Sequence, residues 1–480
     1  MKKKEADLLF RGGTLVDGSG RPRQRLDLAV KDGRILAMGH LNDWVGEQTF
    51  DITGKIMAPG FIDAHAHDDR ICMDAPDMTA KLSQGITSVI VGNCGISLAP
   101  YTAEGEVPEP LNLLGQRHCF QFPNFYSYRQ AVDKARPNLN IVALTGHGTL
   151  RATVMKDITR GADSQELQAM EALLREALDK GSAGFSTGLF YAVNYPADMS
   201  EVVALARIAA EYGRVYSTHM RDEYQGVDAS LRESFETASQ AGASLVISHH
   251  KCAGPENWGR TVETLAMIDE AREIQDVGMD CYPYTAGSTV LRPDLVDGTI
   301  KVLLTWSQTH PEMGGRDLAW IAEEWQCTQQ EAAVRLVPGG ACYFQMEEAD
   351  VRRVLAHPAT MIGSDGLPND PHPHPRLWGA FPRVLGHYAR DLGLFSLEQA
   401  IHKMTGLTAH KYHLKDRGLL APGAIADLTV FDPVTIKDNA TYQNPKQPSS
   451  GMELVVVNGK IAFQNGEEKG ARAGRLVVPG

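Results

Sequence analysis

APGFIDAHAH, at residues 58–67, is the stretch of sequence that decides the fold. A Pro59-Gly60 turn precedes an apolar run that ends in two histidines one residue apart. In a β-strand, side chains two positions apart lie on the same face of the sheet. We therefore expect His65 and His67 to point in the same direction at the end of a strand, where both imidazoles can bind one metal ion.

Short β-type segments occupy both ends of the chain. Before residue 58, and again after about residue 414, apolar runs are bounded by turn signals such as Asp32-Gly33 and Asn458-Gly459. These dipeptides are typical of tight hairpins in an antiparallel sheet. Neither end is long enough to bury a core alone, so we predict one small β-sandwich built from residues 1–57 and 415–480.

Between the two ends, strand-like apolar runs alternate with helical patterns, which indicates an α/β fold with a parallel sheet. Eight segments qualify as strands, at residues 60–67, 87–95, 141–148, 183–189, 215–220, 244–250, 278–284 and 360–365. Eight such repeats fit a (β/α)8 barrel, or TIM barrel, in which functional side chains lie at the carboxyl ends of the strands. We place the barrel at residues 58–414.

The segment between the seventh and eighth strands is longer than one barrel helix and its loops require. Part of it, AWIAEEWQCTQQEAAVRLV, has the pattern of two helices. We predict an inserted helical subdomain at about residues 286–350, over the mouth of the barrel, where a lid would be useful.

Metal-binding side chains stand at five of the eight predicted strand ends. They are His65 and His67 on the first strand, Cys94 on the second, His219 on the fifth, His249 and His250 on the sixth, and Asp365 on the eighth. Imidazole, thiolate and carboxylate groups suit Zn²⁺, which needs an open coordination position for catalysis. A regular strand cannot turn both His249 and His250 inward, and the spacing leaves the choice between them open.

The composition limits the class of protein. With 480 residues, 43% hydrophobic and 22% charged, the chain is typical of a globular protein without long disorder. The net charge of -12 repels nucleic acid and anionic membranes. No run has the length of a signal peptide core or a membrane span, so we expect a cytoplasmic protein. The seven cysteines lack the spacing of a disulfide framework, and nothing in the sequence predicts an oligomeric state.

Longer motifs resemble a known family. The paired histidines after the first strand and the aspartate that ends the eighth resemble the amidohydrolase superfamily. More narrowly, the chain resembles the N-acyl-D-amino-acid deacylases, or D-aminoacylases, in VGNCGIS, STHMRDE, ISHHKCAGPENWGRTVETL, DCYPYTAGSTVLR and IGSDGLPNDPHPHPRLWGAFPRVLG. The resemblance covers nearly the entire chain. It implies hydrolysis of small N-acyl-D-amino acids, with the N-acyl-D-glutamate deacylases as one candidate branch.

The resemblance also implies a set of metal ligands. Many binuclear members of the superfamily use a carbamylated lysine at the end of strand four, but that strand reads AGFSTGL here. Cys94 is the implied substitute, because a thiolate can bridge two metals. The implied sites are a tightly held Zn²⁺ on Cys94, His219 and His249, and a weaker second position on His65, His67, Cys94 and Asp365.

The implied reaction assigns further roles. Asp365 would take a proton from the attacking water and pass it to the departing amine. The substrate α-carboxylate needs a cation, and Lys251, Arg292 and Arg376 follow strands six, seven and eight. Tyr191, Tyr282 and Tyr284 are candidate hydroxyl donors. One α-carboxylate needs only one cation. Three candidate cations would therefore suit a substrate that carries a second carboxylate, as N-acyl-D-glutamate does.

Two other functions fit parts of the pattern. A cyclic amide or imide hydrolase of hydantoinase or dihydroorotase type belongs to the same superfamily, but the missing strand-four lysine and the presence of Cys94 count against it. A catalytically inactive barrel that serves as a scaffold would be expected to lack ligands, whereas the full set is present.

Overall fold

The computed structural model describes residues 3–480. Its centre consists of parallel strands in two sheets, one of three strands in the order β12-β9-β8 and one of six in the order β13-β14-β15-β16-β17-β21. The strands are β8 (Phe61–Asp63), β9 (Ile86–Val91), β12 (Asn140–Ala143), β13 (Thr145–Gly146), β14 (Gly184–Gly188), β15 (Val215–His219), β16 (Ser244–Ile247), β17 (Val277–Cys281) and β21 (Thr360–Ile362). Each of the eight segments expected to be a strand overlaps one of these.

Backbone contacts connect the edges of the two sheets, although no continuous ladder closes them into one. The amide of Ala64 donates to the carbonyl of Ile362 at 3.0 Å, and Ala66 forms a parallel bridge with Gly366. At the other edge, the amide of Ala183, directly before β14, donates to the carbonyl of Ala143 in β12 at 2.7 Å. The carboxyl ends of β8 and β21 therefore lie side by side.

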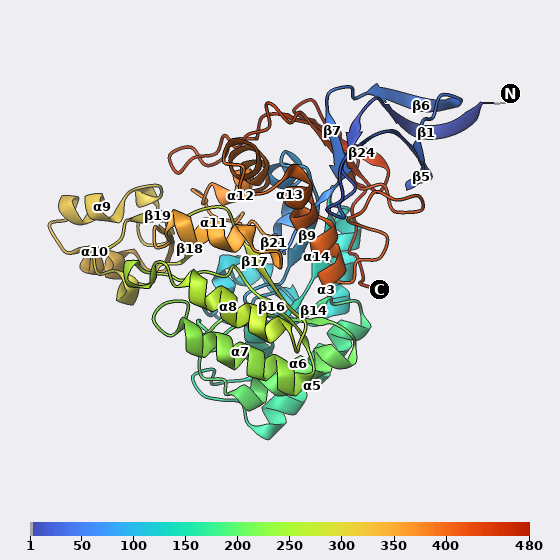
Figure 1. Cartoon of the computed structure of the whole chain (residues 1–480). Coiled ribbons are helices and arrows are strands. Elements are labelled where there is room, and N and C mark those ends of the chain that lie inside the picture. Colours follow the sequence, from blue (N-terminus) through green and yellow to red (C-terminus); the bar gives the residue numbers. More distant parts are fainter. Residues whose placement is uncertain (1–2) are drawn as a thin grey trace.

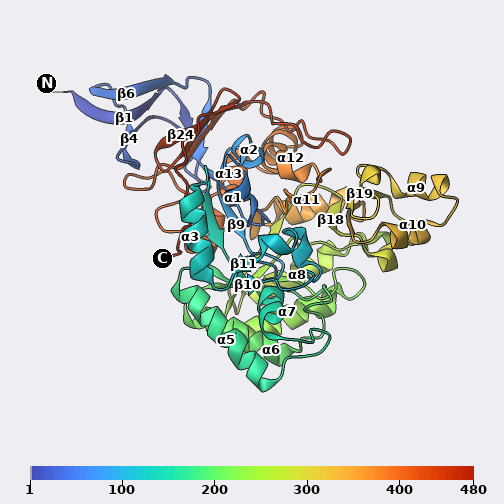
Figure 2. The same ribbon diagram turned by 180° about the vertical axis from the view of Figure 1, so that it is seen from behind.

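Helices cover the outside of the parallel strands (Figures 1 and 2). The longer ones are α3 (Phe125–Ala135), α4 (His147–Val154), α5 (Ser164–Asp179), α6 (Met199–Glu211), α7 (Val227–Ala241), α8 (Thr261–Arg272), α11 (Glu348–Ala356), α12 (Arg376–Arg383) and α13 (Leu397–Met404). In α5, Met170, Leu174 and Leu178 recur every four residues and are buried. This spacing puts one apolar face of the helix against the strands.

Strands from both ends of the chain share one sheet. β22 (Leu428–Phe431) pairs antiparallel with β7 (Ile56–Pro59) in a sheet that also contains β2 (Thr14–Leu15), β3 (Gln24–Arg25), β23 (Met452–Val457), β24 (Lys460–Gln464) and β25 (Glu467–Glu468). A second sheet holds β1 (Lys4–Arg11), β4 (Asp27–Lys31), β5 (Arg34–Gly39) and β6 (Trp44–Asp51). The two sheets contribute to one apolar cluster, which includes Phe10, Val30, Leu428 and Val456.

The hairpin predictions are confirmed. β23 pairs antiparallel with β24, and at the turn between them Asn458 has φ 49° and Gly459 has φ 79°. β4 pairs with β5 in the same way around Asp32 and Gly33. Positive φ at two central residues is the geometry of the tight hairpin turn that Asn-Gly and Asp-Gly favour.

The segment after β17 differs from its prediction as a helical subdomain. It contains α9 (Leu318–Glu324) and α10 (Gln329–Leu336), and also an antiparallel sheet in the order β18-β20-β19, with β18 (Gly287–Val290), β19 (Val302–Ser307) and β20 (Gly339–Tyr343). Leu304, Ile321, Leu336 and Ala341 are buried together in its own core. Two short helices bury little apolar surface alone, so the sheet supplies their packing partner. The segment protrudes at one side of the molecule (Figure 1).

No helix within residues 3–480 combines the length and the apolar character that a bilayer crossing needs. All seven cysteines are free thiols, as the lack of framework spacing predicts.

Candidate metal centre and active site

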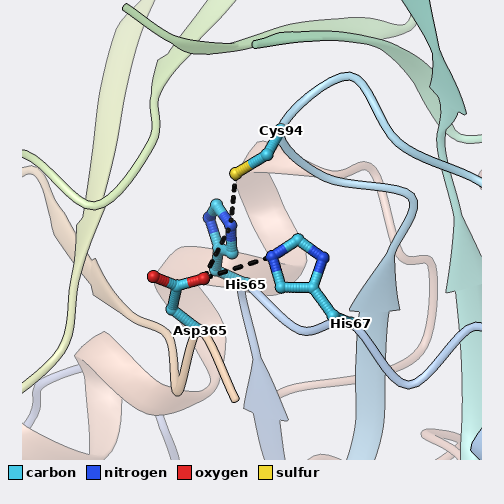
Figure 3. A group of neighbouring side chains, drawn as sticks. All are labelled: His65, His67, Cys94 and Asp365. Atoms are coloured by element: carbon cyan, nitrogen blue, oxygen red, sulfur yellow. Dashed lines mark hydrogen bonds and ion pairs between the residues drawn. The ribbon is translucent and has the colours of Figure 1, made fainter. Parts of the chain in front are cut away.

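Four predicted ligands meet at the carboxyl ends of β8, β9 and β21 (Figure 3). Nε2 of His65 lies 3.2 Å from Sγ of Cys94, and Nε2 of His67 lies 3.2 Å from Oδ1 of Asp365. The four ligand atoms all lie within 4.8 Å of one another, and all four residues are buried. β8 ends at Asp63, so the two histidines lie just beyond the strand rather than in it.

A second group shares one member with the first. Cys94, His219 and His249 bring one ligand atom each within 4.8 Å of the others. Sγ of Cys94 lies 3.3 Å from Nε2 of His249. Both ring nitrogens of His219 are buried without a hydrogen-bond partner among the described residues. Buried polar atoms normally have partners, and a thiol with two imidazoles is a donor set that Zn²⁺ prefers, so these residues fit a zinc ion.

The backbone turns sharply at three of these ligands. Cys94 has φ 55°, His249 has φ 35° and Asp365 has φ 48°, in the left-handed region that non-glycine residues seldom adopt. Each lies two or three residues past the end of its strand, where the turn redirects the side chain toward the centre. The turn brings His249 into the group, whereas Nε2 of His250 lies 2.9 Å from Oγ1 of Thr264, away from the candidate ligands.

A glycine makes room for the cysteine. A Cβ atom at Gly188, the last residue of β14, would lie 2.2 Å from the carbonyl oxygen of Cys94. No side chain fits at that distance, so the close approach of the Cys94 loop to β14 requires glycine at position 188.

Asp280 on β17 contacts two of the candidate ligands and was not predicted from the sequence. Its carboxylate lies 3.2 Å from Nδ1 of His65 and accepts a hydrogen bond of 2.9 Å from the backbone amide of His249. A carboxylate at Nδ1 fixes the tautomer that leaves the Nε2 lone pair free for a metal. The available signal was an acidic residue inside the otherwise apolar strand VGMDC.

Positively charged and hydrogen-bonding neighbours set the protonation state of Asp365, the candidate general base. Burial alone would raise the pKa of the Asp365 carboxyl, but the Arg376 guanidinium and the His67 ring hold this pKa well below its usual range. Nη1 of Arg376 lies 2.9 Å from Oδ2 of Asp365, and Arg376 is fully buried. Burial lowers the pKa of His219 and of His249 well below the usual value. The aspartate is therefore ionised, and both imidazoles are neutral with lone pairs available.

The residues predicted to bind substrate divide between two connected spaces. Lys251, Tyr282 and Tyr191 line an inner pocket together with His67 and Asp365. Arg292 lines an adjoining outer cavity of about 980 Å³, and the two spaces share four wall residues, namely Phe190, Tyr191, Tyr224 and Leu295. Arg376 lines neither space, because it lies behind Tyr282, with its guanidinium 4.5 Å from the centre of that ring.

Each of the three predicted cations already has a carboxylate partner. Nζ of Lys251 lies 2.7 Å from each oxygen of Glu223, Nε of Arg292 lies 2.8 Å from Oδ1 of Asp294, and Arg376 pairs with Asp365. Glu223 is a second candidate functional residue that was not predicted from the sequence. The signal was its position four residues after His219, in the motif STHMRDE.

The chain matches the sequence model of the amidohydrolase family over residues 48–311 and 328–463. Three relatives from Alcaligenes xylosoxydans xylosoxydans match over nearly the full length of both chains. A D-aminoacylase is 47% identical over 98% of this chain and 97% of its own, an N-acyl-D-glutamate deacylase is 46% identical over 96% and 94%, and an N-acyl-D-aspartate deacylase is 45% identical over 99% and 96%.

Solved structures agree with the sequence matches. A crystal structure of D-aminoacylase superimposes with a TM-score of 0.96 and 47% identity, covering 98% of this chain and 99% of the other. The N-acyl-D-glutamate deacylase of Bordetella bronchiseptica, complexed with zinc and a phosphonate inhibitor, superimposes with a TM-score of 0.96 and 45% identity, covering 99% and 100%. The overall fold is thus that of D-aminoacylase, and the chain belongs to the amidohydrolase family.

Proposed function

We propose that the protein is a zinc-dependent N-acyl-D-amino-acid deacylase, which hydrolyses a linear amide to a carboxylate and a free D-amino acid. The observation that carries the proposal is the thiol of Cys94, which two groups of buried ligands share. Three relatives at 45–47% identity over nearly the whole chain bear the names of such enzymes. The D configuration of the substrate rests on these relatives alone.

Cys94, His219 and His249 would hold zinc tightly, and His65, His67, Cys94 and Asp365 would form a weaker second position. Zinc bound there would polarise the scissile carbonyl and acidify a water molecule. Solved structures of family members support this, since one contains zinc and D-aminoacylase has a binuclear metal centre.

Asp365 would act as the general base and then as the general acid. Its ionised carboxylate faces the inner pocket and takes the proton of the attacking water. The same carboxyl then gives that proton to the departing amine. Arg376 keeps the carboxylate ionised between turnovers and fixes its direction.

The substrate α-carboxylate would be held by Lys251 and the hydroxyl groups of Tyr282 and Tyr191, with Arg292 at the outer cavity. Arg376 was also predicted to bind substrate, but it lines neither space and is paired with Asp365 instead. Because all three cations are already paired, their number no longer argues for a second carboxylate in the substrate. The remaining wall of the inner pocket contains five apolar side chains, Ile96, Leu113, Phe190, Leu295 and Leu367, beside the uncharged polar side chains of Ser288, Thr289 and Gln345. We therefore place apolar D-amino acids ahead of D-glutamate as the preferred substrates.

We also propose the division into a terminal sandwich of residues 1–57 and 415–480 and a (β/α)8 barrel of residues 58–414, with the insertion at about residues 286–350, in a cytoplasmic enzyme. The contact between the ends of β8 and β21 and the core shared by the two terminal sheets support this division. Against a cyclic amide hydrolase, β14 reads GFSTG and offers no bridging lysine.

A substrate panel tests the proposed function. We expect N-acetyl-D-leucine to be hydrolysed with a kcat/KM at least about tenfold above that of N-acetyl-D-glutamate, because a carboxylate side chain would lose hydration against apolar walls. The L-enantiomers and hydantoins should remain intact. Release of free amino acid, followed by chiral chromatography, measures all of these. Faster turnover of the D-glutamate derivative would reverse the side-chain preference, and hydantoin opening would overturn the linear-amide assignment.

Replacing Lys251 with methionine tests the carboxylate clamp. We expect KM for N-acetyl-D-leucine to rise about 10- to 100-fold with a much smaller change in kcat, since a charged hydrogen bond contributes about 1.5–3 kcal/mol. Arg292→Met, at the outer cavity, should raise KM less. An unchanged KM in a folded Lys251→Met variant would remove Lys251 from the clamp.

A further inference from the structure

Lys81, on the short helix α2 (Thr79–Leu82), has no assigned role so far. Its side chain is completely buried, with 0% exposure. A buried ammonium group carries a large desolvation cost unless carboxylates and other acceptors surround it. Such a group at the base of a candidate metal centre therefore calls for an explanation.

Three neighbours surround the amino group of Lys81. It donates to Oδ2 of Asp63 at 2.7 Å and to Oγ of Ser364 at 2.6 Å. The carboxylate of Asp68 lies 3.1 Å away, and both aspartates are buried. One positive charge thus lies between two negative charges in a dry environment.

These neighbours flank the ligands of one metal position. Asp63 and Asp68 enclose the segment that carries His65 and His67, and Ser364 directly precedes Asp365. The links extend through the backbone, because Oδ1 of Asp63 accepts from the amide of Ser364 at 2.8 Å and from that of His65 at 3.3 Å. The amide of Asp365 in turn donates to the carbonyl of His65 at 2.7 Å.

The contacts of Lys81 involve the residues of only one of the two candidate metal positions. None of the hydrogen bonds or ion pairs of Lys81 within residues 3–480 reaches Cys94, His219 or His249. Its three partners instead hold together the two chain segments that carry His65, His67 and Asp365. Loss of the amino group would leave two buried carboxylates to repel each other beneath these three residues.

We propose that Lys81 is a positioning residue for the second metal position and for the general base. It fixes the segments of His65, His67 and Asp365 relative to each other without touching the substrate. The proposal rests on the proposed function for the identity of the base, but its effect on metal binding stands apart from the reaction.

Lys81→Met tests this role in the full-length protein. We expect the first zinc equivalent to bind as in the wild type, while the dissociation constant of the second rises about 10- to 100-fold, the usual effect of losing a group that orients metal ligands. With N-acetyl-D-leucine, kcat should fall by a similar factor while KM stays within about twofold. Zinc titration by calorimetry and steady-state kinetics supply the two readouts.

Two further variants make the result decisive. The double variant Lys81→Met/Asp68→Asn also removes one of the two carboxylates that lose their partner. It replaces Lys81→Met in both measurements if the single variant does not fold. Lys411→Met is a matched control, because Lys411 is also buried and pairs with an aspartate, Asp276 at 2.9 Å, but at the amino end of β17. It should leave both zinc affinities and kcat unchanged.

Unchanged second-site affinity and kcat in a folded Lys81 variant would overturn the proposal. So would an equal loss of both zinc equivalents, because a general structural role predicts that pattern. If the wild type hydrolyses no N-acyl-D-amino acid, the proposed function fails while the zinc titration still decides the role of Lys81.

Discussion

Asp365→Asn should lower kcat on N-acyl-D-amino acids by about 10³-fold, within the range that general acid and base groups contribute, while one zinc equivalent stays bound. The amide of asparagine cannot accept the proton of the attacking water. Cys94, His219 and His249 form the group that does not include Asp365, and they keep their ligand atoms. Zinc analysis by mass spectrometry and kinetics with N-acetyl-D-leucine measure the two effects. Undiminished turnover would exclude Asp365 as the base.

The ion pair with Arg376 requires a control for stability. Asparagine leaves the buried guanidinium without its carboxylate, and breaking a buried pair from one side costs about 3–5 kcal/mol. The unfolding free energy of Asp365→Asn, measured in urea, should therefore fall. Asp365→Asn/Arg376→Met removes the orphaned charge and should recover stability. Recovery of stability with kcat still low would separate the loss of the base from the loss of fold.

Cys94→Ala should abolish tight zinc binding and lower kcat/KM by at least about 10³-fold. Its thiol is the one ligand common to both groups, so this single substitution takes a donor from each position. The side chain is buried, and alanine leaves only a small cavity, so the protein should still fold.

Cys252→Ala is the matched control for this substitution. Cys252 is also buried, but its thiol lies near Oγ1 of Thr264, at 3.8 Å, rather than among the metal ligands. It should retain zinc content and activity. A Cys94→Ala variant that binds zinc and turns over substrate at the wild-type rate would refute the ranking of the two metal positions.

Much of the fold follows from periodicity and turn chemistry. Apolar runs of the right length located the parallel strands, and Asp32-Gly33 and Asn458-Gly459 located two hairpins, because these signals are local in the chain. The sheet of the insertion was missed. Its strand GGACY carries no alternating pattern, and it is buried only because α9, α10 and β19 close around it.

The candidate site was predictable to the level of residue type and strand end. The resemblance selected His249, whereas strand geometry alone could not, since the choice depends on a left-handed turn at His249 itself. Asp280 and Glu223 were not predicted, because each contacts residues that are distant in the sequence and come together only in the fold. Likewise, nothing in the sequence indicates that Arg376 would face Asp365 rather than the pocket.

The glycine at position 188 limits the positions from which a bridging metal ligand can come. The Cys94 loop fills the space in which a side chain at the end of β14 would begin, so a cysteine-type and a lysine-type bridging ligand exclude each other sterically. A side chain can be introduced at position 188 only if the Cys94 loop moves away from β14, and that movement would displace the thiol that both candidate metal positions share.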